Sequence, residues 1–245
     1  MKISVVLITL NEEINIQRCL SSLSFANEII VVDGGSNDRT VEFSNFFKAQ
    51  VFKRDFDDFA SQKNYAIEKA SGDWVFSIDA DECVSQKLAD EIQKTVDAQH
   101  SLSAYSVRRK TRLFGRVFCF SGLQSDRPIR LFRKGKASFE GIVHEVLKVE
   151  GSTGSLKEPL EHNSFQTLHS YWRRLEIYTS LEARKDAVTP TSSKLLSKPF
   201  LRFLSIYGLK QGFRDGIEGF IYAVLSSYYE FVRWAKIWEK KEGKV

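Results

Sequence analysis

Three acidic residues within four positions follow an apolar run, in the segment VFSIDADECV (residues 75–84). Carboxylates this close repel one another, so an opposite charge must compensate them. Asp79 and Asp81 form an Asp-x-Asp pair, and hard cations such as Mg²⁺ or Mn²⁺ bind carboxylate oxygens together with substrate phosphates. The pair indicates a divalent-cation site. The alternative is a solvated loop leading into a helix, where acids suit the positive end of the helix dipole.

A second polar segment, VVDGGSNDRT (31–40), places an aspartate and two glycines after an apolar run. As part of a binding site, Asp33 would accept hydrogen bonds from a nucleobase, while Gly34 and Gly35 would allow close approach of the backbone. The alternative is an ordinary loop between a strand and a helix. A dinucleotide-binding fold would carry G-x-G-x-x-G after its first strand, but the sequence there is TLNEEIN, and G-x-x-x-x-G-K-[S/T] does not occur.

Strands and helices alternate over the first hundred residues. Asn11 is the expected N-cap of the first helix, and later helices are predicted over 59–70 and 85–98. The strands read as continuous apolar runs, which indicates a parallel sheet covered on both faces: KISVVLITL, EIIVVD, AQVFKR and DWVFSID. Ligands bind at the carboxyl ends of the strands in such sheets. We therefore expect Asn11, Asp33 and the Asp79/Asp81 pair to converge on one crevice.

The rest of the chain has a different character. Residues 103–149 are β-rich and basic, and GSTGSLKEP (151–159) is typical of a turn-rich loop. A helix is predicted over 167–187, followed by a Ser/Thr/Pro linker, VTPTSSKLLSKP (188–199). The tail over 200–238 combines many aromatic residues with scattered cations.

Composition narrows the class of protein. The chain has 245 residues and a net charge of +5, which suits an anionic partner such as a nucleotide, a phosphorylated sugar, an acidic lipid or nucleic acid. Its three cysteines are widely spaced, which argues against a disulfide framework or a zinc knuckle and favours a reducing compartment. The N-terminal apolar run is interrupted by acids and indicates a buried strand and not a signal peptide. No apolar stretch is long enough to span a bilayer.

Four segments together resemble the family 2 nucleotide-sugar glycosyltransferases: VVLITLNEEINIQRCL, EIIVVDGGSNDRTVE, FASQKNYAIEKASGDWVFSIDADE and RLFRKGKASFEGIVHE. The resemblance implies an α/β GT-A fold, with a Rossmann-like mixed sheet flanked by helices. It also implies inverting transfer of a sugar from a nucleoside diphosphate to a hydroxyl. We expect a catalytic domain over 1–165, with a nucleotide-sugar half (1–100) and an acceptor half (101–165). A helical extension is expected over 166–245.

The resemblance also assigns donor-binding residues. Lys63, in SQKN, would lie near the base or the diphosphate. Asp79 would support the ribose side, and Asp81 would hold Mg²⁺ or Mn²⁺, which stabilises the charge of the departing diphosphate. Arg130 and Arg133 would bind the donor diphosphate or an acceptor phosphate, or else form a solvated basic face. The uracil and ribose pocket would be lined by Leu10, Asn11, Glu12 and Asp33.

A carboxylate must remove the proton from the attacking hydroxyl. Glu145 in FEGIVHE is the first candidate and Asp126 in QSDRP the second, with a surface ion pair as the alternative for each. His144 and His162 are candidates for a remaining metal ligand, beside Asp79 as a second carboxylate, although an isolated histidine is more often structural. Glu82 would either cap the next helix or contact the ion.

The tail from Lys198 to Glu242 resembles that of the bacterial lipopolysaccharide-core glucosyltransferases of the WaaE/KdtX type. Those enzymes add glucose to an inner-core heptose. Its aromatic and cationic residues indicate amphipathic helices on anionic lipid, and Glu218 and Glu230 oppose a membrane crossing. Packing against the catalytic domain or a second copy is the alternative. The expected partners are a UDP-sugar, with UDP-glucose as the first candidate, and a lipid-linked glycan at the cytoplasmic face of the inner membrane.

Two other functions stay open from the sequence. A polyprenyl phosphate would be the acceptor in a dolichyl-phosphate-mannose-synthase-like enzyme, and such an acceptor needs no strong base. A nucleic-acid-binding protein would use the basic segment 108–136, where several phenylalanines accompany the charge, but that segment carries no RNP-type or helix-turn-helix signature.

Overall fold

The structure is a computed structural model that describes residues 1–98, 102–141, 145–185 and 191–242. The chain forms two compact units. The first comprises Met1–Lys110 and Arg127–His162, and the second comprises Thr111–Asp126 and Asn163–Val245. The domain boundary near residue 165 stays a prediction.

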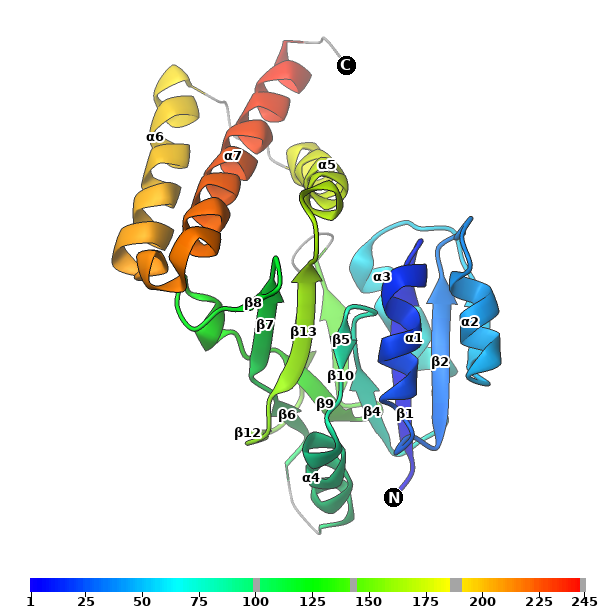
Figure 1. Ribbon diagram of the computed structural model, residues 1–245. Helices are drawn as coiled ribbons and strands as arrows, with labels where there is room; N and C mark the ends of the chain where they lie inside the picture. The colour runs from blue at the N-terminus through cyan, green and yellow to red at the C-terminus, as the bar shows by residue number, and fades with distance from the viewer. Residues whose placement is uncertain (99–101, 142–144, 186–190, 243–245) are drawn as a thin grey trace. The chain divides into compact units, whose positions relative to one another are not determined.

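A seven-stranded mixed sheet is the centre of the first unit (Figure 1). Strands β1 to β4 run parallel to one another, whereas β9 runs antiparallel to both β4 and β6. The order across the sheet is β12 (Thr153–Ser155), β6 (Ala104–Ser106), β9 (Ile129–Arg133), β4 (Trp74–Ser77), β1 (Ile3–Thr9), β2 (Glu28–Asp33) and β3 (Gln50–Lys53). A mixed sheet flanked by helices is the architecture that the sequence predicted.

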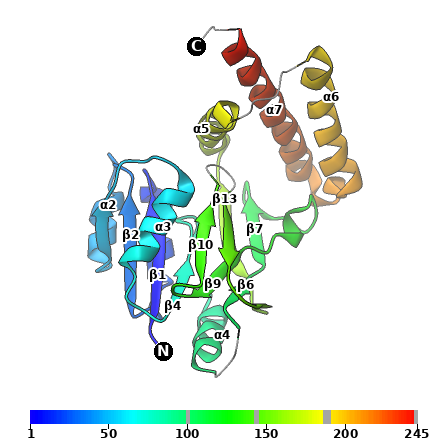
Figure 2. The same cartoon turned by 180° about the vertical axis from the view of Figure 1, so that it is seen from behind.

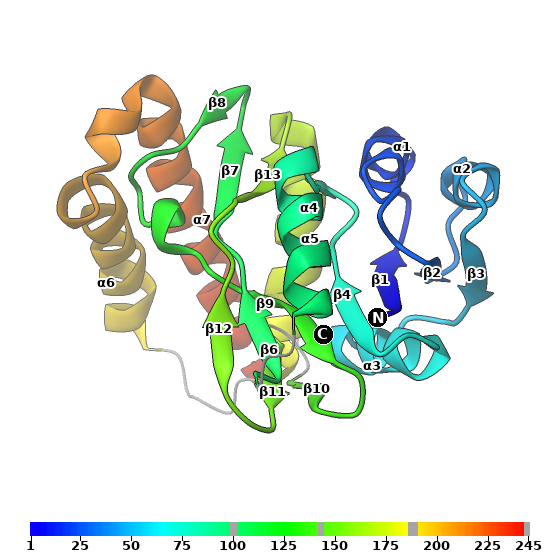
Figure 3. The same cartoon turned by 90° about the horizontal axis from the view of Figure 1, so that it is seen from below.

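Helices cover both faces of this sheet (Figure 3). Successive side chains of a strand point to opposite faces, so the apolar run of β1 supplies Val5 and Leu7 to one face and Val6 to the other. The first face is covered by α1 (Glu13–Ser21), α2 (Thr40–Phe46) and α4 (Gln86–Asp97). The second is covered by α3 (Phe59–Lys69) and the hairpin of β10 (Ala137–Glu140) and β11 (Val146–Val149).

The start of α1 differs from the expectation. Asn11 is not its N-cap: Asn11 has a left-handed backbone (φ 56°), and its Oδ1 accepts the N–H of Asn37 at 2.8 Å. The N–H of Glu13 is satisfied by Asp38 Oδ2 at 3.1 Å. A side chain from the neighbouring loop therefore caps α1, and local sequence gives no sign of such a partner.

The second unit is mainly helical. It contains α5 (Leu168–Lys185), α6 (Ser192–Phe203), the π-helical turn η2 (Leu204–Leu209), the 3₁₀ turns η1 (Leu123–Ser125) and η3 (Gly212–Asp215), and α7 (Gly216–Lys241). Both α5 and α6 pack along α7 (Figure 2), with Tyr171 and Leu175 of α5 against Leu225. Strands β7 (Arg109–Leu113) and β13 (Leu160–Phe165) each start in the first unit and end in the second, where β7 pairs with β8 (Arg116–Val117).

Two segments expected to be irregular are regular. The loop predicted over 151–159 contains β12, which pairs with β6. The linker predicted over 188–199 is wrong from Ser192 onward, because α6 begins there with Thr191 as its cap and continues through Pro199. Serine and threonine favour turns locally, but Leu195 of α6 joins a core with Trp234, and this packing outweighs the local preference.

Candidate active site

Three loops meet at one edge of the sheet in the first unit. Thr9 at the end of β1 pairs with Asp33 at the end of β2, and β4 runs parallel to β1 on its other side. The loops that follow these strands therefore leave from the same edge. Asp33 ends β2, while Asn11 and the Asp-x-Asp segment lie in the loops after β1 and β4, so all three are at the edge that the strand pattern predicted. That they line one crevice stays a prediction.

Asp33 organises its own loop. Its carboxylate accepts hydrogen bonds from Thr9 Oγ1 at 3.2 Å, the N–H of Gly35 at 3.0 Å, and the N–H and Oγ of Ser36 at 2.8 and 2.5 Å. Gly35 has φ +98°, a conformation that favours glycine. Asp33 is only 3% exposed. The observed role of Asp33 is therefore to shape the loop, and nucleobase binding stays a prediction.

The loop after β1 is joined to the loop after β2. The N–H of Asn11 donates to Ser36 Oγ at 2.8 Å, and the N–H of Glu12 donates to Thr40 Oγ1 at 2.8 Å. Leu10 remains 42% exposed beside Gly34. The two loops thus form one rigid surface with an apolar side chain on it.

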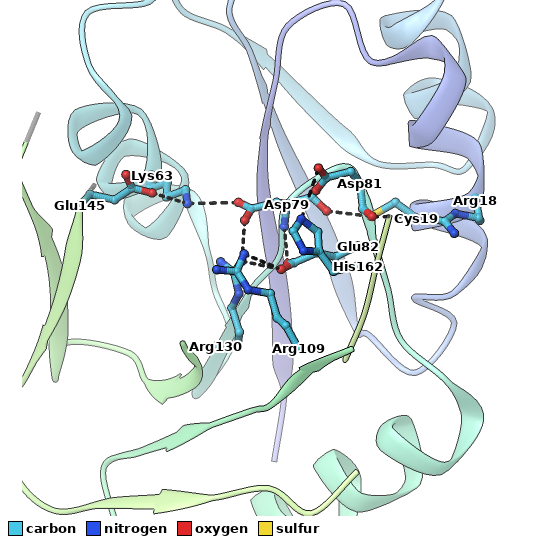
Figure 4. Close-up of polar contacts among 10 residues, drawn as sticks. All are labelled: Arg18, Cys19, Lys63, Asp79, Asp81, Glu82, Arg109, Arg130, Glu145 and His162. Carbon is cyan, nitrogen blue, oxygen red and sulfur yellow. Dashed lines mark hydrogen bonds and ion pairs between the residues drawn. The ribbon is translucent and has the colours of Figure 1, made fainter. Parts of the chain in front are cut away.

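Charged side chains of alternating sign form a cluster around Asp79, which follows β4 (Figure 4). Lys63 Nζ is 2.6 Å from Glu145 Oε1 and 3.1 Å from Asp79 Oδ1. Arg130 Nη2 is 2.5 Å from Asp79 Oδ2 and 2.7 Å from Glu82 Oε1. Three residues predicted for the donor and the first candidate base are thereby brought together. Each carboxylate in this cluster has a Lys or Arg side chain next to it.

The charged groups of this cluster stabilise one another. Burial alone would raise the pKa of Asp79, but Arg130 and Lys63 outweigh it and hold the pKa well below its ordinary range. Burial also opposes the ammonium of Lys63, yet Asp79 and Glu145 raise its pKa. The pKa of Arg130 is raised by Asp79 and Glu82 against the effect of burial. Asp79, Lys63 and Arg130 therefore remain charged at neutral pH.

Glu82 is the supporting residue of the cluster. It is fully buried, and its Oε2 accepts the N–H of Asp79 at 2.9 Å, while Oε1 faces Arg130 and also Arg109 Nη1 at 3.4 Å. Ser85 caps α4, so Glu82 does not. The sequence left the role of Glu82 open and did not single out Arg109. The only local signal was an acid at the start of a short apolar stretch.

Asp81 faces His162. Strand β5 (Glu82–Cys83) pairs with the start of β13, which sets His162 Nε2 3.5 Å from Asp81 Oδ2, and Asp81 is buried. The turn itself is fixed by α1, because Arg18 Nη2 donates to the carbonyl oxygen of Asp81 at 3.1 Å. Cys19 Sγ lies 3.7 Å from the carbonyl oxygen of Asp79.

The donor atoms of Asp81 and His162 fit a divalent cation. Ligands of one octahedral ion at about 2.1 Å lie roughly 3 Å apart, close to the observed separation. Within the described part of the chain, no group of three or more His, Cys, Asp or Glu gathers around such a point. Substrate phosphates and water would have to complete the shell. His144 lies outside the described residues, and both oxygens of Asp79 already contact cations.

Two predicted residues lie apart from this cluster. Arg133 pairs with Trp74 at the start of β4, about 16 Å along the strand from Asp79. Its guanidinium lies over the ring of Trp74 at 4.7 Å, and its Nε donates to the carbonyl oxygen of Leu102 at 3.2 Å. Asp126 belongs to the second unit, where it lines a pocket.

Comparison with known proteins identifies the class. Residues 4–138, more than half of the chain, match the family model described as "Glycosyl transferase family 2". The chain therefore belongs to glycosyl transferase family 2, which confirms the enzyme class that the sequence predicted. Neither the polyprenyl-phosphate alternative nor the nucleic-acid alternative is favoured by these matches.

Individual relatives extend over nearly the whole chain. The lipopolysaccharide core biosynthesis glycosyltransferase LpsC of Rhizobium meliloti is 28% identical over 249 residues, covering 97% of this chain and 92% of the relative. An uncharacterized glycosyltransferase of Rickettsia typhi is 28% identical, covering 97% and 87%. The crystal structure of S. aureus TarS 1–349 has a TM-score of 0.53 at 15% identity, covering 99% and 92%. Together with the family match, this likeness confirms the GT-A fold.

Proposed function

We propose that the protein transfers a sugar onto a hydroxyl of a lipid-linked glycan such as the lipopolysaccharide inner core. The first candidate donor is UDP-glucose, which would supply glucose. The observation that carries the proposal is the charged cluster around Asp79 and Asp81 at the carboxyl edge of the sheet, in a member of glycosyl transferase family 2. The acceptor class is suggested by LpsC, the relative named for lipopolysaccharide core biosynthesis.

The donor would lie across the two joined loops. The exposed side chain of Leu10 offers an apolar surface for the flat face of uracil, and Asn11 and Glu12 border it. Asp33 would fix this surface, because the lone-pair sites of its carboxylate accept four hydrogen bonds from the end of β1 and from the loop after β2. Lys63 and Arg130 hold the Asp79 carboxylate from two sides, so that Asp79 meets the ribose side of the donor in one orientation.

Asp81 and His162 would hold Mg²⁺ or Mn²⁺. When bound, the cation supplies positive charge to the diphosphate as the sugar leaves. The protein contributes the position of its ligands, because β5 pairs with β13 and Arg18 fixes the backbone of the turn. Arg130 adds a second, permanent positive charge next to Asp79.

Glu145 is the proposed general base. Lys63 Nζ lies 2.6 Å from its Oε1, which holds the carboxylate in position to receive a proton from the acceptor hydroxyl. The Oε1 contact with Lys63 leaves the second oxygen to approach the acceptor. Asp126 is the second candidate base, and it lies on the second unit.

The second unit would bring the enzyme to its lipid-linked acceptor. In the described chain, no helix is both long and apolar enough to cross a membrane. The helices α6 and α7 nevertheless expose large apolar side chains: Leu196, Phe200, Leu201, Ile217, Phe220 and Phe231. Lysines and arginines are interspersed, which suits an anionic lipid surface. We place the protein on the cytoplasmic face of the inner membrane.

A thermal-shift screen of nucleotide sugars tests the donor assignment. A ligand that binds only the folded state stabilises it by RT ln(1 + [L]/Kd), about 2.7 kcal/mol at a hundredfold excess over Kd. We expect UDP-glucose with Mn²⁺ to raise the melting temperature more than UDP-glucose alone, and more than other nucleotide sugars. If no UDP-sugar shifts the transition with or without Mn²⁺, the proposed function fails.

A further inference from the structure

The second unit contains a pocket of about 350 Å³, and Asp126 is the one lining residue to which a role is given above. Its walls come from the loop around residues 121–126 and from α6, η2 and α7. Ligand pockets range from roughly 300 to 1,000 Å³, so this one suits a small ligand. The side chains that matter for its chemistry are Ser125, Asp126, Arg202, Lys210 and Tyr222.

A buried aspartate anchors the loop that lines the pocket. Asp215 is 1% exposed, and its carboxylate accepts the N–H groups of Cys119 and Phe120 at 3.0 and 3.1 Å and Ser121 Oγ at 2.8 Å. The N–H of Ser121 donates to the carbonyl oxygen of Lys210 at 2.9 Å. The loop is therefore anchored to the segment YGLKQGFRDGIEGF (207–220).

The backbone conformation favours glycine where this loop meets Lys210. Gly122 has φ +87°, and a Cβ at this position would lie 2.6 Å from Lys210 Cδ and 3.0 Å from Lys210 Nζ. The lysine side chain thus passes directly over the glycine. The close approach directs the ammonium along the wall of the pocket.

Two cations line the pocket without an ionic partner. Neither Arg202 nor Lys210 has a side-chain hydrogen bond or ion pair with any residue that the structure describes. Elsewhere in the same unit, Arg233 pairs with Glu182 at 2.8 Å and Lys236 with Glu176 at 2.7 Å. Guanidinium and ammonium groups in a concave site bind phosphates and carboxylates by charge-assisted hydrogen bonds.

The remaining polar groups suit hydroxyls. The carboxylate of Asp126 also lines the pocket and would repel a bare polyanion, but it can accept hydrogen bonds from a sugar. Burial raises the pKa of Tyr222, so its phenol stays protonated and can donate. A ligand that contacts all four groups would combine one anionic substituent with several hydroxyls.

We propose that this pocket binds a sugar bearing a phosphate or carboxylate group. Arg202 and Lys210 hold the anionic substituent, and Asp126 and Tyr222 hold the hydroxyls. That the sugar belongs to the acceptor glycan is a further step, which rests on the proposed function. Binding acceptor hydroxyls would be a different role for Asp126 from that of the second candidate base.

Calorimetric titration of the full-length protein tests the site. The probes are glucose 6-phosphate and glucuronate, with glucose and inorganic phosphate as controls. We expect at least one charged sugar to bind more tightly than either control. The double variant Arg202→Gln/Lys210→Gln should weaken that binding at least tenfold, because each lost contact involves a charged group. Lys198→Gln is the matched control, since it removes a charge from exposed α6 surface outside the pocket.

Three other outcomes would overturn the proposal. Unchanged binding by the double variant means that the pocket is not the site. Equal affinity for inorganic phosphate and glucose 6-phosphate reduces the site to an anion site. If the double variant loses only its binding to phosphatidylglycerol vesicles, and no soluble sugar binds the wild type, the ligand is a lipid headgroup. The UDP-glucose thermal shift of the double variant should match the wild type, which separates failure of this site from failure of the proposed function.

Discussion

The carboxylate of Asp79 lies between two buried cations, whereas Asp81, two residues later, faces a histidine. This difference separates two acids that look alike in the sequence. Asp79 has both oxygens in contact with Lys63 or Arg130, so its geometry is fixed without a metal. Asp81 is the member of the pair that keeps a facing donor of the kind that metals bind.

The assignment of Asp81 predicts a loss of transfer in Asp81→Ala. Removing one group that stabilises transition-state charge costs roughly 10²- to 10³-fold in kcat, and a steady-state assay of sugar transfer would measure it. Asp90→Ala is the matched control, because Asp90 is exposed on α4 and its carboxylate accepts a hydrogen bond from Gln86 Nε2 at 2.8 Å.

The same assay tests the cation. EDTA should abolish transfer by the wild type, and added Mn²⁺ should restore it. Full transfer in EDTA, or full transfer by a folded Asp81→Ala protein, would contradict the metal role. Circular dichroism and the melting temperature establish that the variant is folded.

The charged cluster also predicts how stability responds to acid. The pKa of Asp79 is lowered well below its ordinary 3.8 in the folded protein, so the unfolded chain binds its proton first. The stabilisation is therefore present above about pH 4 and is lost as the pH falls through the folded pKa. Denaturant unfolding between pH 2 and 7 should show this decline. Asp79→Asn should show a smaller decline and lower stability at pH 7, because Arg130 loses a partner. An unchanged slope would contradict the assignment.

Partners of the cluster illustrate what the sequence could not reveal. Glu82 was visible as a third acid, but its contacts come from Arg109 and Arg130, which lie 27 and 48 positions away. The contact with Arg130 depends on β9 lying antiparallel beside β4, whereas Arg109 comes from β7. Spacing within the motif carries no information about such pairings, so the supporting residues emerged only with the structure.

At the scale of elements, apolar runs predicted β1, β2 and β4 well because buried parallel strands must be apolar on both faces. The two elements that the sequence did not predict, α6 and β12, were missed for the same reason. Helix α6 begins in a Ser/Thr-rich segment and contains Pro199, and β12 lies in a glycine-rich one. Both elements form because another segment packs or pairs with them, and local composition carries no information about that segment.

Helix α6 carries a prediction about membrane binding. Leu196 and Phe200 are 75% and 61% exposed and lie one turn apart, so they share a face. We expect Leu196→Gln/Phe200→Gln to weaken sedimentation with phosphatidylglycerol vesicles at least tenfold, since a fully buried Leu or Phe contributes about 1.5–3 kcal/mol. Phe46→Gln, an equally exposed site on α2, is the control.

Salt and oligomeric state distinguish the possible occupants of this face. Binding to anionic vesicles should fall as ionic strength rises, because surface charges are screened. If the wild type does not bind vesicles but forms a dimer that Leu196→Gln/Phe200→Gln disrupts, a second copy covers the face and the membrane proposal is wrong.

At the scale of the whole molecule, the family match and the fold agree with the sequence, while the division into units does not follow the order of the chain. The predicted catalytic domain is one continuous stretch, but Thr111–Asp126 groups with the C-terminal helices. Asp215 explains this grouping, because it binds the backbone of residues 119 and 120. The functional boundary near residue 165 stays a prediction, because these contacts show only which residues pack together.

This interleaving limits how relatives can be recombined. A chimera that exchanges only the C-terminal segment would pair a foreign Asp215 and Lys210 with the original loop at 119–122, and the anchoring hydrogen bonds would depend on chance compatibility. Residues 111–126 and 163–245 have to be inherited together. If the second unit binds the acceptor as proposed, acceptor preference should transfer between relatives only when both stretches are exchanged.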